Sequence, residues 1–217
     1  MRNRFDEELA RLDRELISMG ALCEEVIAAA AKALMEGDTA LAAQIAPRAG
    51  EIDRQERDIE SLCLKLLLQQ QPVARDLRQI SAALKMITDM ERIGDQAEDI
   101  AEIIGFLQGR SGEECAFVGH MARSAISMVT GSVDAYVRRD TALAREVIAR
   151  DDVVDEDFRK VKATLIDWIA RRPDDGEYAL DLLMIAKYFE RIGDHATNIA
   201  EWVVFAVTGV HNGEELT

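Results

Sequence analysis

Two identical five-residue segments carry the acidic side chains whose spacing is best suited to chemistry. Glu91–Asp95 and Glu190–Asp194 both read Glu-Arg-Ile-Gly-Asp and begin 99 residues apart. On a helix of 3.6 residues per turn, the Glu and Asp of each segment project from one face. Asp99 and Asn198 continue these faces at corresponding positions. Carboxylate and amide oxygens spaced about one turn apart suit a hard or borderline cation, so each face is a candidate metal site.

A solvated helix face is the alternative interpretation of each acidic row. Like charges four residues apart repel and destabilise a helix, however, and a bound cation would relieve that repulsion. Ile93, Ala97 and Ile100 lie on the opposite side of the first helix, so the acids are predicted to face away from the core. Retention of the acids in both copies, while neighbouring residues differ, favours a cation site.

A second pair of segments adds acids from another predicted helix. Asp151 and Asp155 are four residues apart, and their counterparts in the first half are Ala49 and Asp53. If these acids join the rows, each site draws ligands from two helices, and the second half is the better equipped. An acid-rich first turn favoured by the helix dipole is the alternative for Asp151.

Composition favours an all-α fold and opposes some partners. The 217 residues contain three prolines and 5% aromatic residues, which argues against a β-sandwich or barrel. The formal net charge of −15 opposes binding to nucleic acid or an anionic membrane. No apolar signal region or span is evident. Cys23 and Cys63 lie in apolar helical patterns, which predicts buried free thiols in a reducing cytoplasm.

The chain is predicted to be a tandem duplication of two antiparallel three-helix bundles. A heptad seam runs from Phe5 to Ala30, and Asp38–Ala42 recurs as Asp140–Ala144 before the next helix of each half. Short turns require antiparallel neighbours, although the six helices can also merge into one body. The expected domains are 1–108 and 113–208. The six expected helices span about 5–36, 39–70, 73–107, 113–138, 141–170 and 177–207.

Several local features refine this prediction. Pro47 and Gly50 are expected to kink or restart the second helix. Gly94 and Gly193 recur at matching positions, which indicates close approach of a neighbouring helix. The tail from His211 is expected to fray.

A di-metal carboxylate enzyme or metal store is the alternative to a binding protein. Ferritin-like sites use Glu-x-x-His facing the core, but Phe117, Ile192 and Thr208 stand three residues before the three histidines. No phosphate-binding loop, serine nucleophile elbow or Cys–His pair is present. The residues therefore support no covalent or phosphoryl-transfer mechanism, and alone they do not name a function.

The segments Gln70–Asp95 and Tyr188–Glu201 resemble the PhoU family, and the similarity covers almost the whole chain. This resemblance implies two similar three-helix bundles that bind iron, zinc, manganese or related metals on their surface through E(D)xxxD motifs. Ala49 departs from that motif. The metal ligands so implied, together with the added acids, are Glu91, Asp95, Asp99, Glu190, Asp194, Asn198, Asp53, Asp151 and Asp155.

The same resemblance implies a cytoplasmic negative regulator of the phosphate-starvation response. Such a protein is not an enzyme but an adaptor between the ATPase of a high-affinity phosphate ABC transporter and a phosphate-sensing histidine kinase. It would bind no nucleic acid, reach the membrane only through its partners, and form a homodimer.

Overall fold

The computed structural model describes residues 2–69, 72–112, 114–211 and 214–215. Gln70 and Gln71 of the family-like segment, the expected start of the fourth helix at Glu113, and part of the tail lie outside the described residues. The described chain is all-α, as predicted, apart from a two-residue ladder near its end. Within these ranges, no helix combines the length and the apolar character that a membrane-spanning segment requires.

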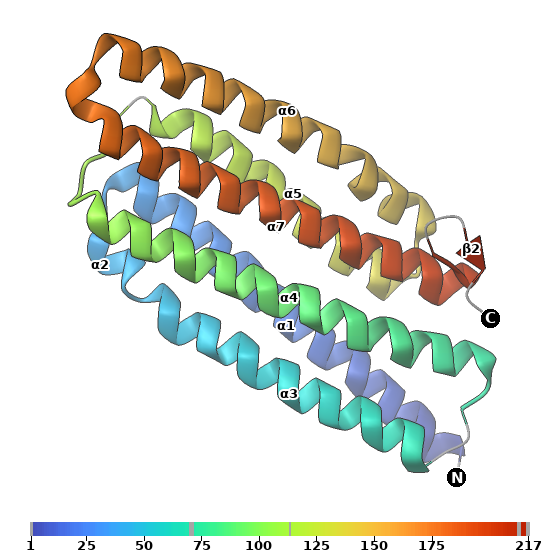
Figure 1. Cartoon of the computed structure of the whole chain (residues 1–217). Helices are drawn as coiled ribbons and strands as arrows, with labels where there is room; N and C mark the ends of the chain where they lie inside the picture. Colours follow the sequence, from blue (N-terminus) through green and yellow to red (C-terminus); the bar gives the residue numbers. More distant parts are fainter. Residues whose placement is uncertain (1, 70–71, 113, 212–213, 216–217) are drawn as a thin grey trace.

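Over the described ranges, six long helices and four short elements follow one another (Figure 1). Their bounds are α1 Arg2–Glu36, α2 Thr39–Ala42, α3 Ile45–Gln69, α4 Ala74–Phe106, α5 Cys115–Arg138, α6 Thr141–Arg171, the 3-10 helix η1 Pro173–Asp175, α7 Gly176–Thr208, and the strands β1 Val210–His211 and β2 Glu214–Glu215.

The duplicated Asp-Thr segments start helices in the same way. The side chain of Asp38 accepts a hydrogen bond from the backbone N–H of Leu41 at 2.9 Å, and that of Asp140 accepts one from Leu143 at 3.0 Å. Each aspartate thus satisfies a backbone donor that has no partner inside the helix. In the first half the helix ends after one turn, and α3 begins at Ile45. The break therefore precedes Pro47, which lies in the first turn of α3, where a missing N–H costs little. Gly50 lies inside the helix.

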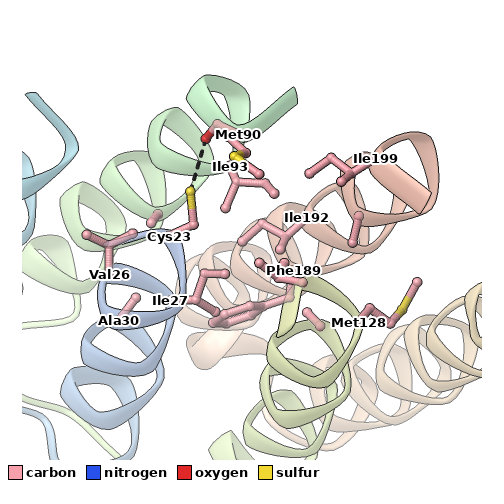
Figure 2. Packing of buried hydrophobic residues seen from close by; sticks show 14 of the residues in the cluster. Cys23, Val26, Ile27, Ala30, Met90, Ile93, Met128, Phe189, Ile192 and Ile199 are labelled. Atoms are coloured by element: carbon pink, nitrogen blue, oxygen red, sulfur yellow. Dashed lines mark hydrogen bonds between the residues drawn. The ribbon is translucent and has the colours of Figure 1, made fainter. Parts of the chain in front are cut away.

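The six long helices form one elongated body with a continuous apolar core. In Figure 1, α4 and α7 run side by side in opposite directions, and α5 lies between α1 and α6. Figure 2 shows Cys23 and Ile27 of α1 packed with Met90 of α4, Met128 of α5 and Phe189 of α7. The predicted seam of α1 is confirmed, because Phe5, Leu12, Leu16, Met19, Cys23, Val26 and Ala30 are buried and Leu9 packs against them.

The predicted close approach of a neighbouring helix is confirmed at Gly94, whereas at Gly193 the neighbouring helix lies at ordinary contact distance. A Cβ at Gly94 would lie 3.1 Å from Ile52 Cδ1 of α3, and one at Gly193 would lie 3.4 Å from Val154 Cγ1 of α6. Ile52 and Val154 are themselves counterparts in the two halves. The pairs α3–α4 and α6–α7 therefore pack in the same way, which brings the acids beside each glycine towards the neighbouring helix.

Two glycine substitutions should have opposite effects on stability. Gly37 has φ +66°, and an added Cβ would lie 2.4 Å from the carbonyl oxygen of Gly109. Gly37→Ala should therefore cost at least about 2 kcal/mol. Gly193→Ala meets only ordinary contacts and should gain up to about 1 kcal/mol from helix propensity. Urea unfolding followed by circular dichroism compares the two variants. Equal changes in the free energy of unfolding would contradict the different surroundings of Gly37 and Gly193.

The three cysteines are free and buried. Cys23 donates a hydrogen bond to the carbonyl oxygen of Met90 at 3.4 Å (Figure 2). Burial, the main cause, raises the pKa of Cys23, and it raises that of Cys63 to about 12. The prediction of buried free thiols at Cys23 and Cys63 is thus confirmed.

The end of the chain differs from the expected frayed tail. Val210 and His211 pair antiparallel with Glu215 and Glu214. The His211 ring stacks on Trp202 of α7 with 4.0 Å between the ring centroids. This aromatic contact holds the start of the tail against the last turns of α7.

Candidate metal site

Three carboxylates converge where α3 passes α4. Asp53 of α3 and Glu91 and Asp95 of α4 offer oxygen atoms that all lie within 4.8 Å of one another. We call these three residues the first cluster. Each side chain is half-buried. Glu91 and Asp95 reach one face of α4 because they are four residues apart, and the close packing at Gly94 brings Asp53 to them.

The first cluster concentrates negative charge. Burial, followed by the charge of Asp95, raises the pKa of Glu91, and Asp53 and Glu56 contribute in the same direction. Arg92 is a nearby cation, with guanidinium nitrogens 3.4 Å from Glu91 and 3.1 Å from Asp95. Its side chain is more than half exposed, so solvent weakens its compensation. Glu56 was not among the predicted residues, although its position three residues after Asp53 places it on the same face.

The corresponding acids of the second half lie where α6 passes α7. We call four of these residues the second cluster: Asp151, Asp155, Glu190 and Asp194. The negative charges of the first three each contribute to raising the pKa of Asp194. Here a cation is built in: Lys187 forms an ion pair with Glu190 and lies over the ring of Phe158 at 5.3 Å. Thr88 and Glu56 occupy these two positions in the first half. Among the described residues, only the first cluster brings three carboxylates within 4.8 Å of one another, although the sequence predicted the second half to be the better equipped.

Asp99 is not among the three converging carboxylates, although the charge of Asp95 contributes to raising its pKa, and both Asp99 and Asn198 have hydrogen-bond partners across the α4–α7 interface. Asp99 accepts a hydrogen bond from the hydroxyl group of Tyr188. Asn198 donates one to Asp89 at 3.0 Å. Eight residues on a helix add up to a rotation of roughly 80°, which turns both side chains from the acidic faces towards the α4–α7 interface. Asp89, which the sequence prediction missed, also accepts a hydrogen bond from His195 at 2.9 Å.

Ala49, the departure from the repeated acid spacing, is buried at 2% exposure. The contribution of α3 to the first cluster is therefore Asp53. Three carboxylates with no nitrogen or sulfur donor suit magnesium, calcium, manganese or ferric iron better than zinc.

Acidification should stabilise the metal-free chain between pH 7 and pH 5. Burial, then Glu190 and Asp151, raise the pKa of Asp194 from 3.8 to about 6. A raised pKa favours the protonated folded state. The contribution of Asp194 to the free energy of unfolding is complete below pH 3.8, and it is lost as the pH rises through about 6. The melting temperature of the chelator-treated chain should therefore rise from pH 7 to pH 5. Asp194→Asn should remove part of that rise. If the melting temperature of this variant depends on pH as steeply as that of the wild type, the carboxylates of the second cluster do not repel one another as described.

Comparison with known proteins supplies independent information. The PhoU domain model matches residues 16–104 and 118–203. A "Phosphate-specific transport system accessory protein PhoU homolog" of Clostridium acetobutylicum is 35% identical over 207 residues, covering 94% of each chain. The homologue of that name from Pseudomonas aeruginosa is 34% identical, covering 94% of this chain and 86% of its own.

Solved structures agree with these sequence matches. The crystal structure of PhoU from Pseudomonas aeruginosa superimposes with a TM-score of 0.91 at 34% identity, covering 95% of this chain and all of that one. The phosphate transport system regulatory protein PhoU from Streptococcus pneumoniae gives 0.86 at 25% identity, covering 98% and 99%. Duplicated acidic segments, antiparallel helices and near full-length similarity together establish that the chain belongs to the PhoU family.

Proposed function

We propose that this protein is a regulatory accessory factor of phosphate transport and a negative regulator of the phosphate-starvation response. In this function it is an adaptor between the ATPase of a phosphate ABC transporter and a phosphate-sensing histidine kinase. The observation that carries the proposal is the similarity, over nearly the whole chain, to proteins named as accessory to the phosphate-specific transport system. A regulatory role also agrees with the name of the similar pneumococcal protein, a phosphate transport system regulatory protein.

The state of the reactive side chains supports binding rather than catalysis. His120 is paired with Asp157 at 2.8 Å and His195 with Asp89 at 2.9 Å. The three thiols are buried. These groups stabilise contacts between helices, and neither pair lies in an acidic cluster. The same observation disfavours a metal store or di-metal enzyme, because those sites take histidine ligands from the bundle.

Metal binding belongs to the same proposal, with the first cluster as its site. Asp53, Glu91 and Asp95 fit a cation by their shared proximity and their uniform oxygen chemistry. A bound cation would neutralise the repulsion among the three carboxylates. Because the ligands come from two helices, binding would also hold α3 against α4. Manganese and iron are the first ions to test, with zinc for comparison.

The remaining assignments follow from the adaptor function. We propose that the protein acts in the cytoplasm as a homodimer and reaches the membrane only through its partners. Its net charge of −15 opposes direct adsorption to an anionic bilayer.

A strain lacking the protein should express phosphate-starvation genes in high phosphate. A transcriptional reporter measures the response, and the wild-type gene should restore repression. Pull-down from phosphate-replete cells, with and without chelator, should recover the kinase and the transporter ATPase. A reporter that stays repressed in the deletion strain would overturn the adaptor function, whatever metal the purified protein binds.

A further inference from the structure

A polar cavity of about 290 Å³ lies at one end of the bundle, away from both acidic clusters. It forms where the start of α4 meets the ends of α5 and α7 and the fourth turn of α1. Arg75 and Arg78 of α4 and Arg139 at the end of α5 line it, together with Asp13. Three guanidinium groups and one carboxylate give this cavity a net charge of +2 within a chain whose net charge is −15.

Within the described residues, Arg75 and Arg78 form no ion pair, although Asp76 also lies in the first turn of α4. Arg75 and Arg78 are the second and fifth residues of the helix, where the positive end of the dipole disfavours cations. The preceding residue, Val73, makes no side-chain cap. The Nε of Arg78 is buried and has no hydrogen-bond acceptor within the described parts of the chain. A buried guanidinium N–H without an acceptor is costly, and an anion in the cavity would supply one.

Hydrogen bonds orient the opposite wall. Asp13 accepts from Tyr136 at 2.8 Å and from Gln79 at 2.9 Å. The amide of Gln79 is thereby turned so that its oxygen accepts from Arg139 at 3.1 Å. Asp13 therefore serves to fix Gln79, and through it Arg139, at the edge of the cavity.

Arg139 adopts a backbone conformation that an arginine rarely takes. Its φ is +53°, in the left-handed region. The corresponding residue of the first half is Gly37, with φ +66°, so there the same helix end is made by the residue best suited to it. Placing arginine here costs free energy, and such costs concentrate at functional sites.

The other end of the bundle has the equivalent helix junction without arginine at these three positions. Cys115 and Tyr178 stand where Asp13 and Gln79 stand, and they keep the equivalent contact at 3.5 Å. The counterpart of Arg78 is Glu177, and that of Arg139 is Gly37. The equivalent junction therefore has a different charge pattern. Its arginine, Arg110, stacks on the Tyr178 ring at 3.7 Å and is paired with Asp175 at 2.9 Å, so the guanidinium group there has a carboxylate partner.

We propose that this cavity binds a phosphate-type oxyanion. Guanidinium groups match phosphate geometry through paired N–H donors. The net charge of +2 complements a phosphate dianion. A water molecule, with one heavy atom, takes up about 30 Å³ in the liquid. Orthophosphate has five heavy atoms, so a cavity of about 290 Å³ is larger than this ion needs. Its remaining wall, Val203, Ala206 and Val207 of α7, is apolar. The ligand is therefore free phosphate or the phosphoryl end of a small organic molecule.

Isothermal titration calorimetry on the full chain tests the anion site without reference to the adaptor function. Chelator is present throughout, so that metal ions on the acidic clusters cannot capture phosphate. Orthophosphate, AMP and adenosine are titrated at matched ionic strength. We expect saturable binding of orthophosphate or AMP, one per chain, and none of adenosine. Tighter binding of AMP identifies an organic phosphate, and equal or tighter binding of orthophosphate identifies the free ion.

The two halves of the molecule suggest the test variants. Arg139→Gly and Arg78→Glu copy the counterparts Gly37 and Glu177. Each should weaken binding at least about tenfold, because each removes charged hydrogen bonds. Arg139→Gly should keep the wild-type melting temperature, since glycine suits the left-handed backbone. Arg138→Gln removes a neighbouring exposed arginine that is paired with Asp134, and it should change affinity less than about twofold.

Three results would overturn the site. They are the absence of saturable binding by either phosphate at millimolar concentration, equal binding of AMP and adenosine, and equal affinity of the wild type and Arg139→Gly. Any of them can occur in a chain that still represses the starvation response, so failure of the anion site is distinguishable from failure of the adaptor function.

Discussion

Phe189→Ala should destabilise the chain by about 3–5 kcal/mol, the range for loss of a fully buried aromatic side chain. Phe189 has no exposed surface and lies among residues of both halves, including Ile27 of α1 and Met128 of α5 (Figure 2). The cavity left by the ring would therefore weaken contacts between the halves as well as within the second. Urea unfolding followed by circular dichroism measures the loss.

The matched control is Phe106→Ala, at a side chain that is 65% exposed, which should change stability by less than about 0.5 kcal/mol. Both variants should unfold in a single transition, because one core spans all six long helices. Two separate transitions, with only one moved by Phe189→Ala, would show that the halves unfold independently and would contradict a shared core.

Helix positions and the core were predictable from the sequence because both depend on local periodicity. Apolar residues at alternating intervals of three and four define the buried seam of α1, and duplicated aspartates mark two helix starts. Pro47 misled the placement of the break by a few residues. Proline is compatible with the first turn of a helix as well as with a kink, and periodicity alone does not distinguish these cases.

The acids that share a site were only partly predictable. Glu91 and Asp95 follow from spacing on one helix, and Asp53 from the repeat. The place of Asp99 depends on which neighbour packs against each side of α4, and that is a tertiary property. The preference for the first cluster depends on Lys187, whose pairing with Glu190 requires the side-chain geometry.

The arginine cavity was not predicted at all. Its polar residues come from three distant parts of the sequence. More than sixty positions separate Asp13 from Arg78, and more than sixty separate Arg78 from Arg139. No local pattern joins them. One signal was present in the repeat itself: comparison of the halves shows arginine where glycine ends the corresponding helix. Differences between repeats that share a fold are therefore a second source of candidate sites, beside the features that the repeats retain.

Metal should raise the melting temperature of the wild-type chain, and Asp53→Asn with Asp95→Asn should abolish that rise. A ligand present at about a hundred times its Kd stabilises the folded state by about 2.7 kcal/mol. For a chain of this length, that corresponds to a shift of about 5–10 °C. Without metal, the double variant should be at least as stable as the wild type, because Asp95 and Asp53 both raise the pKa of Glu91 by repulsion.

The second half supplies a matched control, since Asp155 and Asp194 are the counterparts of Asp53 and Asp95. Asp155→Asn with Asp194→Asn removes the same number of carboxylates but leaves the first cluster intact. It should retain most of the shift, because Lys187 already compensates Glu190. Differential scanning fluorimetry with manganese, ferrous iron or zinc, together with elemental analysis, compares the two double variants. Loss of the shift only in the second variant would place the metal between α6 and α7, whereas absence of bound metal in the wild type would identify both clusters as solvated acidic faces.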